Sequence, residues 1–186
     1  MPVLSVVEVP DQRLRTTCAP VAEVTDDVRR LAADMIETMY AANGIGLAAP
    51  QVGVLTRVVV IDLQERAAVD GEPAEVQAED AEPERVRDPK AYINPELVWV
   101  SEELSTYNEG CLSIPDQYAE VTRPARCRVR WLDEQGAEHE ADMDGLMSTC
   151  MQHEIDHLNG VLFIDHISRL KRDMVMRKLA KARKAG

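Results

Sequence analysis

The stretch QHEIDHLNG at residues 152–160 contains the pattern H-E-x-x-H, formed by His153, Glu154 and His157. On a helix the two histidines lie one turn apart and about 40° apart around the axis, so both imidazoles can reach one metal ion. Glu154 lies on a neighbouring face, where it can contact a water molecule without binding the ion. Because three fixed residues recur by chance, the pattern alone leaves open both a metal site and an ordinary helix with two partly exposed histidines.

The residues around this stretch predict the helix that the pattern needs. Asp144 can cap a helix that runs to His157 or Leu158, and Asn159-Gly160 supplies a stop signal. Apolar side chains recur along it, at Leu146, Met147, Cys150, Met151 and Ile155. The H-E-x-x-H pattern is therefore predicted to lie on a helix with apolar faces to bury.

A third ligand would decide which chemistry follows. The metzincin pattern H-E-x-x-H-x-x-G-x-x-H matches through Gly160 and then fails, because Phe163 stands where the third histidine belongs. Other zinc proteases use a glutamate from a later helix as the third ligand, but no glutamate follows Glu154 in this chain. The remaining histidines, His139 and His166, do not lie at a recognised distance in sequence from the H-E-x-x-H pattern. Standard zinc protease architecture is therefore disfavoured.

A cysteine is the natural alternative, since a Cys/His₂ set resembles catalytic metal sites that leave a fourth position open. Cys111 stands in YNEGCLSIPD, after a glycine and before a proline-bounded segment that we predict to be a loop. Loops of this kind often carry functional residues. The other cysteines are poorer candidates, because Cys18 lies near the N-terminus, Cys127 in an alternating strand and Cys150 on the histidine helix, where it is expected to pack.

Length and composition predict one globular domain over residues 1–186. The chain is 45% apolar, 29% charged and only 4% aromatic, so its core must be aliphatic. The four cysteines form no CxxC pair and no signal-like segment opens the chain, which predicts free thiols and a cytoplasmic location. No window approaches the roughly 18 apolar residues of a membrane span.

Periodicity predicts several further elements. Residues 25–42 have the apolar rhythm of an amphipathic helix, with Thr25 as N-cap and Asn43-Gly44 as the stop. A last, basic helix is expected from Ile167 or Ser168 to residue 186. Strands of an antiparallel or mixed sheet are predicted at 57–63, 91–100, 126–132 and 138–142.

Two segments are unusual in charge. Residues 64–90 hold nine acidic residues and three prolines, and are expected to form an exposed surface insertion, more plausibly without function than with a binding role. Residues 169–186 carry a balance of +7 within a chain of net charge −12, which leaves −19 elsewhere. The chain therefore has an acidic body and a basic end.

Three segments together resemble one family. GIGLAAPQVG at 44–53, EGCLSIP at 109–115 and QHEIDHLNG resemble, in order and spacing, the signature motifs of the peptide deformylases. The likeness covers nearly the whole chain except the 64–90 insertion. GIGLAA is not the glycine-rich turn of a dinucleotide site, because a predicted helix precedes it and Pro50 and a strand follow.

The resemblance implies an α+β fold with antiparallel or mixed sheets around the H-E-x-x-H helix, flanked by the N-terminal helix and the basic C-terminal helix. It implies removal of the formyl group from the N-terminal methionine of newly made proteins, with release of formate. It also implies one divalent metal ion held by Cys111, His153 and His157, most often Fe²⁺, with Zn²⁺ or Ni²⁺ able to substitute. Coordination chemistry alone would favour zinc at such a site.

The resemblance also implies roles for other residues. Glu154 acts as general base and then general acid, while the Gln51 amide and the Leu112 backbone N–H stabilise the tetrahedral intermediate. Thr149 and Tyr118 depart from the family's usual residues, which leaves detailed subsite preferences open. The substrate-binding positions are Ile45, Gly46, Gly110, Thr149 and Cys150.

The expected partners are N-formylmethionyl nascent peptides and, through the basic end, the ribosome, whose phosphates attract positive charge. No membrane or DNA partner is expected. Two alternatives remain: a metallopeptidase that uses Cys111 as third ligand, and a non-catalytic protein with a structural metal. A purely structural site would need neither Gln51 nor Glu154, which argues against the second.

Overall fold

The computed structural model of the protein describes residues 2–64 and 86–185. Within them the strands form a five-stranded sheet in the order β1-β2-β3-β6-β7 and a two-stranded sheet, β4-β5, and each neighbouring pair is antiparallel. The strand bounds are β1 Gly46–Ala48, β2 Val58–Ile61, β3 Lys90–Val100, β4 Leu104–Cys111, β5 Ile114–Pro124, β6 Cys127–Leu132 and β7 Glu138–Met143.

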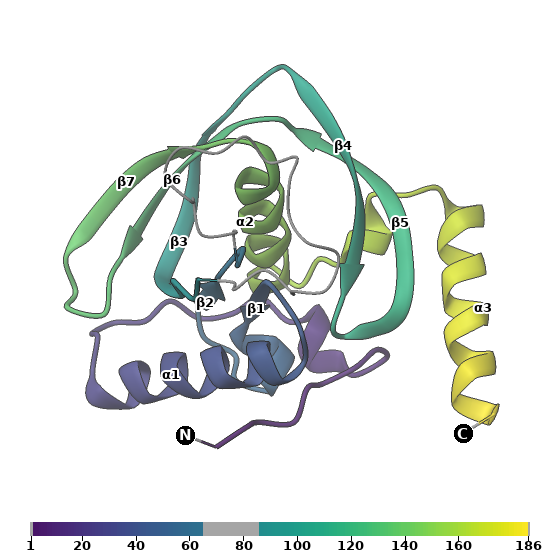
Figure 1. Ribbon diagram of the computed structural model, residues 1–186, viewed down its shortest axis with the longest axis horizontal. Helices are drawn as coiled ribbons and strands as arrows, with labels where there is room; N and C mark the ends of the chain where they lie inside the picture. Colours follow the sequence, from purple (N-terminus) through teal and green to yellow (C-terminus); the bar gives the residue numbers. More distant parts are fainter. Residues whose placement is uncertain (1, 65–85, 186) are drawn as a thin grey trace, which may run out of the picture.

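Three α-helices accompany the sheets in this part of the chain: α1 Asp26–Ala41, α2 Gly145–Leu158 and α3 Arg169–Ala185. Short 3-10 turns lie at Gln12–Arg15, Ala49–Val52 and Phe163–Asp165. Figure 1 shows α2 at the centre, with the larger sheet on one side and the β4-β5 ribbon on the other, while α3 lies outside β5. This is the predicted α+β fold around the H-E-x-x-H helix.

Strand β2 lies in the middle of the core, and this position explains why its sequence is uniformly apolar. Alternate side chains of a strand point to opposite faces of the sheet. Val58 and Val60 pack with the methionines of α1, whereas Val59 and Ile61 pack against α2. All four are buried, so both faces of the sheet are covered by helices at this point.

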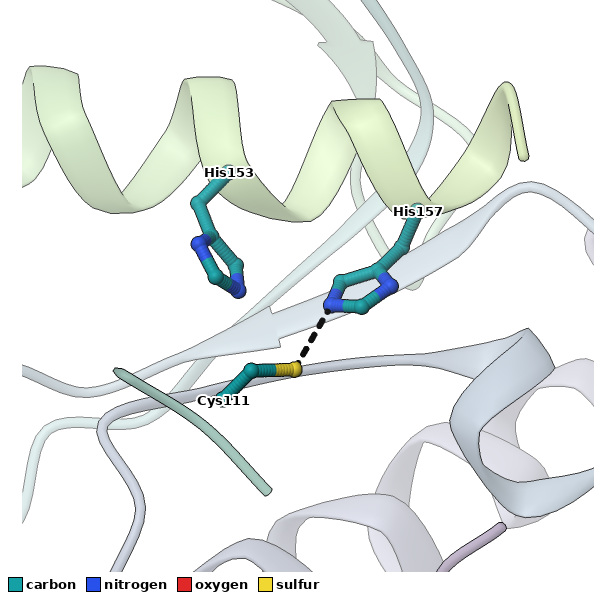
Figure 2. Close-up of side chains that lie close together, drawn as sticks. All are labelled: Cys111, His153 and His157. Carbon is teal, nitrogen blue, oxygen red and sulfur yellow. Dashed lines mark hydrogen bonds between the residues drawn. The ribbon is translucent and has the colours of Figure 1, made fainter. Parts of the chain in front are cut away.

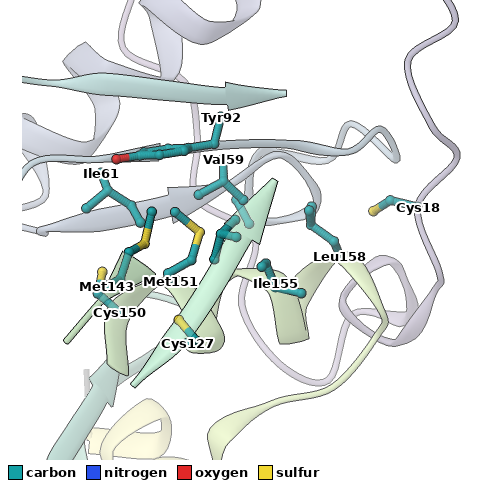
Figure 3. Packing of buried hydrophobic residues seen from close by; sticks show 12 residues of the cluster. Cys18, Val59, Ile61, Tyr92, Cys127, Met143, Cys150, Met151, Ile155 and Leu158 are labelled. Carbon is teal, nitrogen blue, oxygen red and sulfur yellow. The ribbon is translucent and has the colours of Figure 1, made fainter. Parts of the chain in front are cut away.

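The cluster between the larger sheet and α2 is rich in sulfur, as Figure 3 shows for Met143, Met151, Cys127 and Cys150. Flexible thioethers fill irregular space in a core that has few aromatic rings. Phe163, the one phenylalanine of the chain, is buried in another cluster between β5 and α3. The predicted aliphatic core is therefore confirmed, with sulfur as the main supplement.

The predicted helices and four predicted strands are present, and no end differs from its predicted position by more than two residues. Helix α1 has Thr25 at its N-cap, and Asn43 takes the left-handed conformation, with φ of 54°, that ends it. Strands β1, β4 and β5 were not predicted. The prediction that Cys111 lies in a loop was wrong, because this residue ends β4, beside a register shift in the β4-β5 pair.

Residues 65–85 of the predicted insertion lie outside the described residues. Both of its described ends are anchored on Asp62, whose carboxylate accepts hydrogen bonds from the backbone N–H groups of Gln64, at 2.8 Å, and Asp88, at 3.0 Å.

Among the described helices, none is long and apolar enough to cross a membrane.

The end of α2 gives a stability prediction. Gly160 has φ of 73°, and a Cβ there would lie 2.6 Å from the carbonyl oxygen of Arg15. Gly160→Ala therefore adds a backbone clash to a left-handed conformation, and we expect it to lower the free energy of unfolding by about 3 kcal/mol. Urea denaturation of the purified protein measures this change.

Gly136→Ala is the matched control. Gly136 has a similar φ of 80°, but a Cβ there would meet only Val24, at 3.9 Å. Gly136→Ala should lower the free energy of unfolding by about 1 kcal/mol, because it adds only the strain of a left-handed conformation and no backbone clash. Equal losses for the two variants would show that the contact with Arg15 does not constrain the end of α2.

Candidate active site

Helix α2 and the end of β4 bring together the three predicted metal ligands. His153 and His157 project from the same side of α2, and Cys111 approaches them from β4, as Figure 2 shows. The ligand atoms of the three residues all lie within 4.8 Å of one another, and Cys111 Sγ is 3.3 Å from His157 Nε2. Two ligands of one tetrahedral zinc-like ion would lie roughly 3.5 Å apart, so this spacing fits a metal site.

The orientation of His153 supports the same conclusion. Its Nδ1 lies 2.9 Å from Oε2 of Glu109, which is buried. A carboxylate in this position holds the proton on Nδ1 and leaves the Nε2 lone pair for an ion. Three ligands, one thiolate and two imidazoles, would leave a fourth position for a substrate or water. The residues present therefore fit a divalent metal ion.

Glu154 follows His153 and lies on the wall of the cavity beside the ligands. It is only 4% exposed, and its Oε2 has no hydrogen-bond partner among the described residues. Burial raises the pKa of this carboxyl to about 7. A carboxyl group without an internal partner, next to a metal site, is suited to exchange protons with a bound substrate or water.

Gln51 reaches the same place from the 3-10 turn after β1. Its Oε1 accepts a hydrogen bond from the Ala48 N–H at 2.9 Å, which turns the amide nitrogen toward β4. That nitrogen lies 3.2 Å from Ser113 Oγ and 3.5 Å from Cys111 Sγ. Sequence reasoning identified Gln51 but not Ser113, which helps to orient it.

A cavity of about 500 Å³ opens beside these groups. It has the size of a small-molecule or peptide side-chain site. Glu154, Gln51, Leu112, Cys111 and His153 line it, whereas His157 is not among the lining residues. The residues predicted to bind substrate also line it: Ile45, Gly46, Gly110, Thr149 and Cys150.

Two glycines in the wall allow close approaches. A Cβ on Gly46 would lie 2.5 Å from Glu154 Oε1 and 2.9 Å from Cys150 Sγ, so only glycine lets β1 pass this close to α2. A Cβ on Gly110 would lie 2.4 Å from the ring of Tyr118, which is 63% exposed at the cavity mouth. At both positions, therefore, a larger residue would force neighbouring groups of the cavity wall to shift.

A buried ionic network behind the ligands was missed from the sequence. Arg123 on β5 contacts both carboxylate oxygens of Glu109, at 2.6 and 3.0 Å, and Asp156 of α2 at 2.7 Å. Burial opposes the charge on Glu109, but the hydrogen bonds from His153 and Arg123 outweigh it and lower the pKa of this carboxyl. Glu109 is the first residue of the motif EGCLSIP, whereas no motif or periodicity in the sequence indicated a role for Arg123.

The chain is similar to a known family over almost its whole length. The family model described as polypeptide deformylase matches residues 3–173. The peptide deformylase of Rhizorhabdus wittichii is 60% identical over 185 residues, which cover 100% of this chain and 98% of that protein. The peptide deformylase of Novosphingobium aromaticivorans is 53% identical over 189 residues, covering 100% of both chains.

Solved structures agree with this likeness. A peptide deformylase from Ehrlichia chaffeensis has 41% identity and a TM-score of 0.83, covering 98% of this chain and 97% of that one. One from Legionella pneumophila has 37% identity and a TM-score of 0.84, covering 99% and 97%. The Ehrlichia chaffeensis protein has also been solved in complex with actinonin.

Proposed function

This chain belongs to the polypeptide deformylase family, and from that premise we propose how its own residues carry out the reaction. Members of the family are metal-dependent hydrolases that remove the N-formyl group from nascent peptides. The substrate is thus the formylated N-terminal methionine of a newly synthesised protein, and formate is released. The observation that carries the residue assignment is the convergence of Cys111, His153, His157 and Glu154 beside one cavity.

Cys111, His153 and His157 would hold one divalent ion per chain, with Fe²⁺ as the native ion and Zn²⁺ or Ni²⁺ able to substitute. The donor set and the Glu109 contact support a metal, while the preference for iron rests on the family resemblance. When bound, such an ion supplies Lewis-acid activation of water and of the formyl carbonyl.

Glu154 is the proton carrier of the proposed mechanism. Its carboxylate takes the proton from the attacking water and delivers it to the departing α-amine, acting first as base and then as acid. Its position beside Gly46 places it against the segment that would hold the substrate backbone. The unpartnered Oε2 is consistent with a group whose hydrogen-bond partner arrives with the substrate.

Gln51 and Leu112 would stabilise the tetrahedral intermediate. The Gln51 amide nitrogen is directed toward Cys111, and Leu112 is the next residue in the chain and lines the cavity. Each hydrogen-bond donor in such a position lowers the barrier by roughly 3 kcal/mol.

Gly46 would bind the substrate backbone as an added strand, and Ile45 would contact the substrate from the cavity wall beside it. Strand β1 is an edge strand of the sheet, because it pairs with β2 on one side only within the described residues. The Ile45 carbonyl accepts from the Asp62 N–H, so the backbone groups of Gly46 point to the free edge. The methionine side chain of the substrate would lie in the cavity, where it is surrounded by Gly110, Thr149 and Cys150.

Formate release from a formyl-methionyl peptide tests this function. The parent protein, loaded anaerobically with Fe²⁺, should release one formate per peptide and leave the unformylated peptide intact. Cleavage of peptide bonds in the unformylated peptide would instead support a metallopeptidase. Release of no formate at all would contradict the assignment.

We infer that residues 1–186 form one catalytic domain that works in the cytoplasm. The three core clusters are built from elements distributed along the chain, which supports a single domain. The four cysteines are free thiols, and the reducing cytoplasm, where nascent chains are made, is consistent with that state. Residues 64–90 remain an acidic surface insertion in this proposal.

The basic end of the chain is proposed to dock on the ribosome. Val175 and Leu179 fix α3 to the body of the protein by burial, while Leu170 is 72% exposed. The free face carries exposed cations that form no ion pair within the described residues: Lys171, Arg177, Lys178, Lys181 and Lys184. Unpaired cations on one helix are attracted to the phosphates of ribosomal RNA.

Reversal of two of these charges tests the docking. The double variant Lys178→Glu/Lys181→Glu should bind purified ribosomes more weakly. The slope of the logarithm of its binding constant against the logarithm of the salt concentration should become less steep by about 2, one for each lost phosphate contact. Lys90→Glu/Arg126→Glu makes the same change in net charge away from α3 and should leave binding unchanged. Equal binding by both double variants would remove the proposal.

A further inference from the structure

Thr149, in the second turn of α2, carries a hydroxyl group that the fold leaves without a partner. The residue lines the cavity and is 4% exposed. Its Oγ1 is enclosed and has no hydrogen bond to any described residue. A buried hydroxyl without a partner is destabilising, so this one needs an explanation.

The helix itself does not satisfy this group. A threonine inside a helix ordinarily donates its hydroxyl hydrogen to the carbonyl four residues earlier, which here belongs to Gly145, but that bond is absent. The preceding residue shows that hydroxyls on α2 can be satisfied: Ser148 Oγ accepts from Gln152 Nε2 at 2.9 Å and donates to Cys127 Sγ at 3.4 Å.

Thr149 is not the only residue at the cavity with an unsatisfied polar atom. Five buried side-chain polar atoms in the described residues lack a partner, and two of them belong to residues that line the cavity, Thr149 and Glu154. Since the Glu154 carboxyl is assigned to the substrate's reacting end, the Thr149 hydroxyl is left for a second part of the same ligand. The partner of Thr149 would then arrive with the substrate.

The surroundings of Thr149 show which part of the substrate that is. Ile45, Leu146 and Cys150 line the same wall, and Cys150 belongs to the sulfur-rich core cluster of Figure 3. Such a wall suits an unbranched apolar side chain. In a methionine side chain the one hydrogen-bond acceptor is the thioether sulfur, which is weak but adequate for a hydroxyl that has no other partner.

We propose that Thr149 is a specificity-determining residue whose hydroxyl donates a hydrogen bond to the sulfur of the substrate's N-terminal methionine, and so selects sulfur over a methylene group of the same shape. This inference rests on the proposed function, since the substrate is taken to be a formyl-methionyl chain. A site that hydrogen-bonds its ligand discriminates against an analogue without the partner atom, because the buried group then stays unpaired.

Two substrates and one isosteric variant test the proposal. Norleucine replaces the sulfur of methionine by a methylene, so formyl-methionyl and formyl-norleucyl peptides of otherwise identical sequence are compared by kcat/KM for formate release. The parent should prefer the methionyl peptide, and Thr149→Val should reduce this preference about fivefold, as expected for loss of one weak hydrogen bond. Thr149→Ser, which keeps the hydroxyl, should retain most of it.

The ratio of the two kcat/KM values does not depend on how much of a variant is folded, and Thr149→Ala provides a second variant without the hydroxyl. Thr149→Val should melt no lower than the parent, because the hydroxyl it removes has no partner inside the protein. An unchanged preference in Thr149→Val, with formate still released, overturns the proposal alone. A parent that deformylates neither peptide overturns the proposed function and this inference with it.

Discussion

Glu154→Gln is expected to lower kcat for formate release about 10³-fold while the metal content stays at about one ion per chain. Glutamine has the shape of glutamate and can occupy the same buried position, but it cannot take a proton from water or return one to the amine. Loss of general acid–base catalysis typically costs 10²- to 10⁴-fold, which brackets this expectation. Because Glu154 is not assigned as a ligand, metal analysis separates its role from metal binding.

Glu102→Gln makes the same chemical change at an exposed carboxylate in the turn between β3 and β4. It should leave both kcat and metal content as in the parent. A Glu154→Gln protein that keeps its ion and retains near-parental kcat would show that another group moves the proton, and the assignment of Glu154 would have to be abandoned.

Cys111→Ala is expected to remove the metal and, with it, the activity. Loss of a hydrogen-bond partner around a ligand already weakens metal binding 10- to 100-fold, so loss of the thiolate ligand should weaken it by more than about 100-fold. Only two histidines would remain, and an ion held by them is easily taken by a chelator. Metal content after dialysis against a weak chelator, followed by formate release, measures both effects.

Cys127→Ala is the matched control for this substitution. Cys127 is a buried cysteine of β6 in the core cluster beside α2, and it takes no part in the proposed site. It should keep one ion per chain and most of the activity, with some loss of stability from the smaller side chain. If Cys111→Ala kept its ion as firmly as Cys127→Ala does, Cys111 would not be the third ligand.

Helices and buried strands were predictable because their signals are local. The spacing of His153 and His157 matches the helical period, and the stop signal after Leu158 is short-range. The run at β2 is uniformly apolar because helices cover both faces of the sheet there. Such patterns depend on neighbours within a few residues, so they can be recognised before the fold is known.

Strands β4 and β5 were missed for the opposite reason. Their side chains alternate between exposed and partly buried positions and include Asn108, Glu109 and Gly110, which have weak strand preference. What makes them strands is their pairing with each other, which a single-segment pattern does not contain. The same pairing fixes the place of Cys111, which the sequence suggested as a ligand but assigned to a loop.

The sequence by itself determined the chemistry available to this protein: an H-E-x-x-H helix, a cysteine in a second motif and a glutamine in a third. Tertiary structure alone decided how these groups meet. It set Cys111 3.3 Å from His157, placed Glu109 on His153 and buried Arg123 between Glu109 and Asp156. The physical reason is that helical spacing is fixed by hydrogen bonds between residues close in sequence, whereas buried charged groups acquire their partners only when distant segments pack together.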